Sequence, residues 1–167
     1  MTSQRISVSD NLQEYSYELS EPVGKKFDPL FKPELTPKEM MELGVFGAHY
    51  FEGEQDEFPA SWFKNARLSD MHDPSQNFFE IDASQTRQEW QRKGWMSDDD
   101  PRGWFQWYCR YFMGRRLGEE DQRQIKRWKN MTRHVGQIKK FCPPGDVTCR
   151  RRQRQALLHW AYDSRKI

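Results

Sequence analysis

The sequence predicts a mostly α-helical protein that forms one compact domain, and three observations support this fold class. The chain has 167 residues, which is the length of a single domain. Hydrophobic residues make up only 35% of it, but 7 Trp, 6 Tyr and 11 Phe supply large side chains for a core. The C-terminal part repeats apolar residues at helical spacing. This composition excludes wholesale disorder, and no run approaches the roughly 20 apolar residues of a membrane span.

The chain divides into an N-terminal arm and a helical domain. Residues 1–33 show no sustained period, so we expect an extended, partly disordered arm, followed by a single domain over residues 34–167. Thr36 and Glu39 have the spacing of a capping box, which predicts a helix over about residues 36–43.

The middle of the chain gives a weaker pattern. Residues 44–51 are a short aromatic segment bounded by glycines, and periodicity alone does not distinguish a buried strand from an irregular packed turn there. In the segment 56–63 that follows, Pro59 blocks regular strand pairing. We therefore expect a possible small β element near residues 45–63. Residues 84–93 end at Gly94 and predict a short helix, with Trp90 as its apolar anchor.

Three helices are expected in the C-terminal part, over about residues 101–116, 119–141 and 148–163. Asp100 is the predicted N-cap of the first, whose aromatic residues cover most of its circumference, as in a buried helix. Pro143-Pro144-Gly145 ends the second. The apolar stripe of the second helix consists of Ile125, Trp128, Met131, Val135, Ile138 and Cys142.

Charge is distributed very unevenly along the chain. Residues 1–100 carry 10 basic and 20 acidic side chains, whereas residues 101–167 carry 17 basic and 5 acidic ones, so a net charge of +2 combines about −10 and +12. Such an asymmetry indicates either an end that binds a polyanion or an internal contact between the two halves.

The basic C-terminal helices predict nucleic-acid binding, because phosphate contacts require several cations along one face. Some of these charges have simpler explanations, since cations in the last turn of a helix complement its dipole and others are merely solvated. Cations at a helix start are locally unfavourable and need an acidic or phosphate partner. The pattern does not distinguish DNA from RNA. The expected contact residues are Arg123, Lys126, Arg127, Arg133, Arg150, Arg151, Arg152 and Arg154.

Two other function classes remain open. The first is a small enzyme acting on nucleic acid or a phosphorylated substrate, with a pocket between the aromatic helix and residues 44–63; its candidate residues are His49, Glu57 and Arg110. A buried Arg110 would need a carboxylate or phosphate partner. No phosphate-binding, dinucleotide, hydrolase or metalloprotease motif is found, so we expect no cofactor and no metal. The second class is a protein-interaction module whose basic face binds an acidic partner.

The cysteines and the N-terminus bear on location. Cys109, Cys142 and Cys149 make an odd number, and the first thirty residues contain no apolar signal core. We therefore expect reduced, buried thiols in an intracellular protein, either cytoplasmic or nuclear, although Cys142 and Cys149 are close enough in sequence to meet. The spacing does not fit zinc.

Three segments also indicate a family. Asp-Glu-Phe-Pro-Ala-Ser-Trp-Phe (56–63), Asp-Pro-Arg-Gly-Trp-Phe-Gln-Trp-Tyr-Cys-Arg-Tyr (100–111) and Arg-Gln-Ala-Leu-Leu-His-Trp-Ala-Tyr (154–162) resemble a small protein family without an assigned activity. The resemblance covers residues 34–167. It implies a single compact domain, and no functional residue follows from it.

Overall fold

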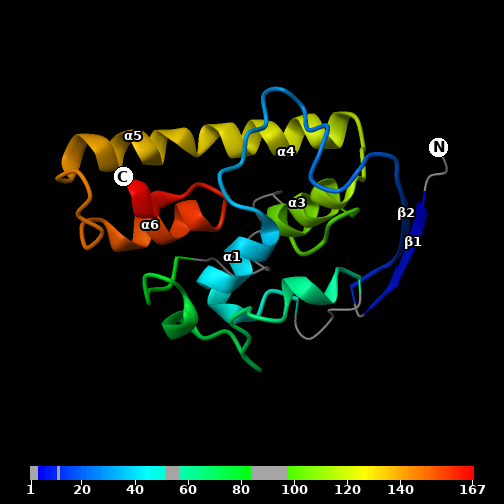
Figure 1. Cartoon of the computed structure of the whole chain (residues 1–167), viewed down its shortest axis with the longest axis horizontal. Helices are drawn as coiled ribbons and strands as arrows, with labels where there is room; N and C mark the ends of the chain where they lie inside the picture. The colour runs from blue at the N-terminus through cyan, green and yellow to red at the C-terminus, as the bar shows by residue number, and fades with distance from the viewer. Residues whose placement is uncertain (1–3, 11, 52–56, 84–97) are drawn as a thin grey trace.

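The computed structural model describes residues 4–10, 12–51, 57–83 and 98–167, and within them the chain is mostly helical with one small sheet (Figure 1). This confirms the predicted fold class. The helix expected over 84–93 lies outside the described residues. The described helices are α1 (Pro37–Leu43), α3 (Trp104–Met113), α4 (Glu119–Asn130), α5 (Thr132–Phe141) and α6 (Arg151–Leu158), and short 3₁₀ turns cover Phe46–Ala48, Ala60–Trp62, Pro74–Gln76 and Ser164–Lys166.

The sheet is an antiparallel hairpin of β1 (Gln4–Ser9) and β2 (Glu14–Leu19), in which Ile6 pairs with Tyr17. It therefore lies in the segment that we expected to be an extended arm. Its apolar side chains occur at every second position, which is the strand period, but over only a few residues of each strand. In Figure 1 the hairpin stands at one end of the molecule, beyond α3 and α4.

The expected location of the β element near residues 45–63 was wrong. Phe46, Gly47 and Ala48 have φ values of 55°, 65° and 61°, so the chain makes a left-handed turn that no strand can contain. Residues 60–62 form a second tight turn. Residues 52–56 lie outside the described part of the chain.

Helix α3 is the centre of the core. It begins at Trp104, after Gly103, rather than near Pro101, and eight of its residues are at most 4% exposed. The rings of the α3 residues pack around Phe31, whose centroid lies 5.0–6.3 Å from five neighbouring rings. Asp100 does not cap the helix, because its carboxylate binds the guanidinium groups of Arg110 and Arg115 inside the core.

Helices α4 and α5 follow one another along one side of the molecule, and α6 runs beneath α5 (Figure 1). The single helix expected over 119–141 is interrupted at Met131, whose amide donates to the carbonyl three residues back. The predicted apolar stripe faces the core, since Ile125, Trp128 and Ile138 are buried. The third C-terminal helix is shorter than expected, because Arg150 before it is left-handed.

The predicted capping box is present at the start of α1. The Thr36 hydroxyl accepts a hydrogen bond from the amide of Glu39 at 3.1 Å, and the Glu39 carboxylate accepts from the amide of Thr36 at 3.0 Å. Met40 and Met41 then pack into the core below α3.

Candidate functional site

Three basic side chains recur at seven-residue spacing along α4 and α5. Lys126, Arg133 and Lys140 are all exposed, while Ile125 and Ile138 point into the core. Seven residues are nearly two helical turns, and Met131 between α4 and α5 keeps right-handed helical φ and ψ of −71° and −13°, so the three cations share one outward face. From Lys126 to Lys140 the rise is about 21 Å at 1.5 Å per residue.

The first residues of α6 bring further cations to the end of this face. The Arg150 guanidinium lies 4.7 Å from the ring centroid of Phe141, and the Lys140 ammonium lies 5.2 Å from the same centroid. Arg152 is exposed, and Arg151 donates to the carbonyl of Phe79.

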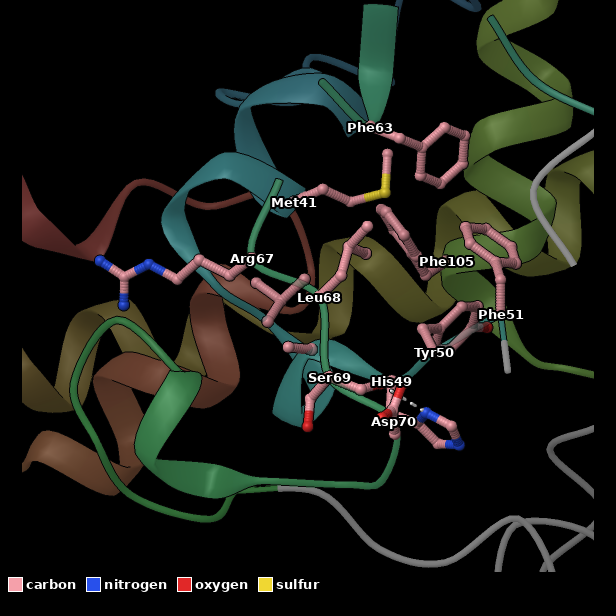
Figure 2. Close-up of a pocket in the computed structure, with 12 residues that line it drawn as sticks. Met41, His49, Tyr50, Phe51, Phe63, Arg67, Leu68, Ser69, Asp70 and Phe105 are labelled. Atoms are coloured by element: carbon pink, nitrogen blue, oxygen red, sulfur yellow. Dashed lines mark hydrogen bonds between the residues drawn. The ribbon is translucent and has the colours of Figure 1, made fainter. Parts of the chain in front are cut away.

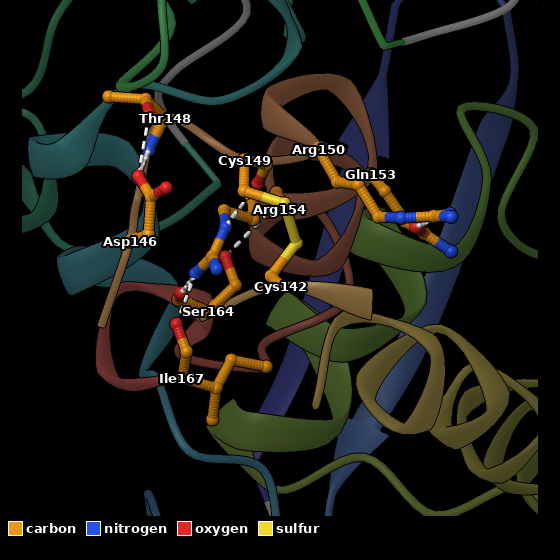
Figure 3. The surroundings of a disulfide bond; sticks show 9 residues. All are labelled: Cys142, Asp146, Thr148, Cys149, Arg150, Gln153, Arg154, Ser164 and Ile167. Atoms are coloured by element: carbon orange, nitrogen blue, oxygen red, sulfur yellow. Dashed lines mark hydrogen bonds between the residues drawn. A yellow bond between two sulfur atoms is a disulfide. The ribbon is translucent and has the colours of Figure 1, made fainter. Parts of the chain in front are cut away.

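A disulfide joins Cys142 to Cys149 and closes the loop between α5 and α6 (Figure 3). This corrects the expectation of reduced thiols. The loop reverses direction through hydrogen bonds from Asp146 to Pro143 and from Cys149 to Asp146, which bring the two cysteine Cα atoms to 5.9 Å. Cys109 is a free thiol inside the core, and burial raises its pKa.

Arg154 is not available for a phosphate contact. It is 0% exposed, and its guanidinium donates to the carbonyls of Cys149, Ser164 and Ile167 (Figure 3). The expectation that Arg154 belongs to the nucleic-acid contact residues is therefore wrong. Its side chain instead connects α6 to the last residues of the chain by hydrogen bonds.

Arg123 and Arg127 are only partly available. Arg123 forms an ion pair with Glu120 one turn earlier, with a 2.5 Å contact between Nε and Oε1. Arg127 lies over the ring of Trp160 at 5.3 Å and donates to Gln124, and burial together with Arg123 lowers its pKa to about 10.

Two acidic groups of the first hundred residues bind arginines outside this face. Glu57 and Asp100 pair with Arg110 and Arg115 beside the hairpin. Within the described ranges, no carboxylate lies within ion-pair distance of Lys140 or of five of the predicted contact residues, which are Lys126, Arg133, Arg150, Arg151 and Arg152. The described residues thus do not show internal neutralisation of these charges, which was the alternative to an end that binds a polyanion. Lys140 was not among the predicted contact residues, and its exposed position in the same row as Lys126 and Arg133 adds it to this face.

The three candidate catalytic residues do not form one site. Arg110 is fully buried and donates to Glu57, Asp100 and the carbonyl of Asp99, which supplies the carboxylate partner that the sequence required. Glu57 also accepts a hydrogen bond from the Tyr17 hydroxyl at 2.5 Å. His49 lies in a separate cavity.

That cavity has a volume of about 600 Å³ and lies between residues 45–51, residues 63–70 and α3 (Figure 2). The imidazole Nδ1 of His49 binds the carbonyl of Ser69 at 3.0 Å at one end of it. The sequence placed a pocket between the aromatic helix and residues 44–63, but it did not indicate the residues that follow Phe63.

Among the described residues, no helix has the length and apolar character needed to cross a bilayer. No three His, Cys, Asp or Glu side chains among them are grouped so as to hold a metal ion.

In comparisons with known proteins, no family model matches this chain, and neither a curated protein nor a solved structure is significantly similar to it.

Proposed function

We propose that this protein binds nucleic acid through the exposed cations of α4, α5 and the start of α6. The observation that carries the proposal is the outward face of Lys126, Arg133 and Lys140, which are exposed and have no ion-pair partner among the described residues. Exposed cations that are not neutralised internally are available to a polyanion.

The length of this face suits a nucleic-acid backbone. Double-stranded DNA carries one charge per roughly 1.7 Å of axis, so a face about 21 Å long meets several phosphates. Arg150 adds a charge at the Lys140 end of this face, because both side chains lie over the ring of Phe141, and the disulfide closes the loop between α5 and α6. Arg152 is exposed at the start of α6. Each phosphate that is neutralised releases counterions, which is the main source of affinity in such complexes.

A salt titration of binding to duplex DNA, single-stranded DNA and RNA tests this proposal and identifies the preferred polymer. The variant Arg133→Gln, Lys140→Gln, Arg152→Gln removes three of the proposed contacts. Because each contact contributes about 0.9 to the slope of log K against log salt on duplex DNA, we expect the slope to fall by up to roughly 2.7.

A matched control removes the same charge elsewhere. Arg5→Gln, Lys38→Gln, Lys64→Gln takes three positive charges from the hairpin, from α1 and from the 63–70 segment. This control should keep the wild-type slope. Equal loss in both triple variants would show that only net charge matters and would overturn the assignment of the interface.

The two alternatives give different results in the same experiment. Cut or altered strands on a gel would favour a nucleic-acid enzyme, although the structure separates His49 from Glu57 and Arg110. Absence of binding at low salt would favour a module for an acidic protein partner.

Nucleic acid occurs in the cytoplasm and the nucleus, and we propose that the protein is located in one of these compartments. The Cys142–Cys149 disulfide weighs against it, because disulfides persist mainly in oxidising compartments. Alkylation of the free thiols in cell extracts shows whether Cys142 and Cys149 are reduced or joined in the cell, and so tests this location.

A further inference from the structure

The cavity beside His49 has the features of a small-molecule site that is separate from the basic face. Its volume of about 600 Å³ is in the range of ligand pockets, which extends from about 300 to 1,000 Å³. Residues from three parts of the chain enclose it (Figure 2).

Aromatic rings form one side of the cavity. Phe51 lies against Phe63 and Phe105 with centroid separations of 6.3 and 5.9 Å, and Tyr50 lies 5.1 Å from Phe105. The Tyr50 hydroxyl is bound to the carbonyl of Arg102 and accepts from the amide of Gln106, so it is not directed at a ligand. Tyr50 and Phe63 are half-buried and offer ring surface, which attracts both apolar groups and cations, while the buried Phe51 and Phe105 pack behind them.

The backbone next to the cavity is strained. Phe46 and Ala48 adopt left-handed φ values, which cost roughly 1–2 kcal/mol for each non-glycine residue. The turn is held by hydrogen bonds from the Phe46 amide to His159 at 3.2 Å and from the Gly47 amide to Asn77 at 2.8 Å. Strained backbone that its surroundings hold in place is concentrated at functional sites. This turn supplies Ala48 to the cavity wall, and His49 follows it directly.

The polar groups at the end of the cavity are acceptors. Because the Ser69 carbonyl can only accept, Nδ1 of His49 donates the hydrogen bond between them. Asp70 is exposed beside it, with no ion pair to any described residue. The Arg67 guanidinium points away from the rings and donates to the carbonyl of Gln76 (Figure 2).

From this combination we infer that the cavity binds a small organic cation: an amine that places an apolar or aromatic body against Tyr50 and Phe63 and its ammonium group near His49 and Asp70. Ring faces and a carboxylate both favour a positive charge, and the one cationic side chain in the lining is directed elsewhere. The site does not depend on the proposed nucleic-acid contact, because none of its residues lies on α4, α5 or α6.

Binding of three probes of similar size tests the inference: 2-phenylethylammonium, neutral 2-phenylethanol and anionic 3-phenylpropanoate. We expect saturable shifts of the backbone NMR signals of His49, Ser69 and Asp70 with the amine. Its Kd should be at least about tenfold lower than that of the alcohol, and the carboxylate should not bind.

Two variants at exposed positions locate the site without disturbing the core. Leu68→Trp fills the mouth and should abolish binding, whereas Met71→Trp adds the same ring three residues further on, outside the lining, and should leave the Kd unchanged. Asp70→Asn should raise the Kd of the amine about tenfold, while Glu14→Gln, a charge-matched change in the hairpin, should not.

The inference is overturned if 3-phenylpropanoate binds as well as the amine, or if Leu68→Trp binds the amine like the wild type. Absence of any shift at millimolar amine also overturns it. Circular dichroism and the NMR spectrum of each free variant establish that the fold is retained.

Discussion

The guanidinium of Arg110 makes two parallel hydrogen bonds to the carboxylate of Glu57, from Nε to Oε2 at 2.7 Å and from Nη2 to Oε1 at 3.0 Å. Both partners lie beside the hairpin, where the rings of Tyr15 and Tyr17 stand 5.0 and 5.3 Å from the guanidinium. Removing only one member of such a buried ion pair strongly lowers the stability of the fold, because the other charge stays buried without a partner.

Removal of the cation should therefore destabilise the fold. Arg110→Met leaves the Glu57 carboxylate without its counter-charge, and we expect the free energy of unfolding to fall by about 3–5 kcal/mol in urea denaturation. The double variant Arg110→Met, Glu57→Leu should recover part of this loss, because no buried charge is then left unpaired. A loss below about 1 kcal/mol for Arg110→Met alone would contradict this view of the pair.

Stability should also decrease in mild acid because of His159. Burial lowers the pKa of this histidine to about 3, against about 6.5 in the unfolded chain, so the unfolded state binds the proton first. The free energy of unfolding should thus fall by up to about 1.4 kcal/mol for each pH unit between about 6.5 and 3. Denaturation at a series of pH values measures this slope, and His159→Gln should flatten it.

The disulfide should contribute moderately to stability. Closing a loop of this length restricts the unfolded chain by about 2–3 kcal/mol, so Cys142→Ser, Cys149→Ser should lower the free energy of unfolding by that amount. In denaturant, a thiol assay should detect one free thiol in the oxidised wild type, that of Cys109, and three free thiols after reduction. Three thiols without any reductant would show that the bond does not form.

Gly47 should not tolerate a side chain. An added Cβ would lie 2.4 Å from Cδ2 of His72 and 2.9 Å from the amide of Asp73, and φ is already +65°. We expect Gly47→Ala to cost more than 2 kcal/mol, since a steric clash adds to left-handed strain. Gly136→Ala is the control, because it is helical and its Cβ would meet nothing within 4 Å. Its expected effect is a slight stabilisation.

The parts of the fold that depend on neighbours in sequence were predictable. The capping box of Thr36 and Glu39 and the stripe from Ile125 to Ile138 are local patterns, and the structure contains both. The position of Arg110 among aromatic residues also indicated that it needs a carboxylate or phosphate partner.

The remaining features depend on distant contacts. The sequence could not name Glu57 as the partner of Arg110, because 53 residues separate them. The pairing of Cys142 with Cys149 could not be predicted without the geometry of the loop between them. The left-handed turn could not be predicted, because Gly47 is compatible with it but Phe46 and Ala48 do not indicate it. The turn is also stabilised by a hydrogen bond to His159, which lies near the other end of the chain. The sequence does not distinguish Arg154 from its basic neighbours, but its side chain is buried.

The partners of Arg110 also bear on the order in which the chain folds. Its guanidinium binds groups from Gln13, Glu57, Asp99 and Asp100, and the most distant of these is 97 residues away. Contacts that close long loops carry the largest entropic cost, so we expect the hairpin to dock after α3 and α4 have packed. Substitutions in β1 and β2 should then mainly accelerate unfolding and leave the refolding rate nearly unchanged, and stopped-flow kinetics would measure both rates.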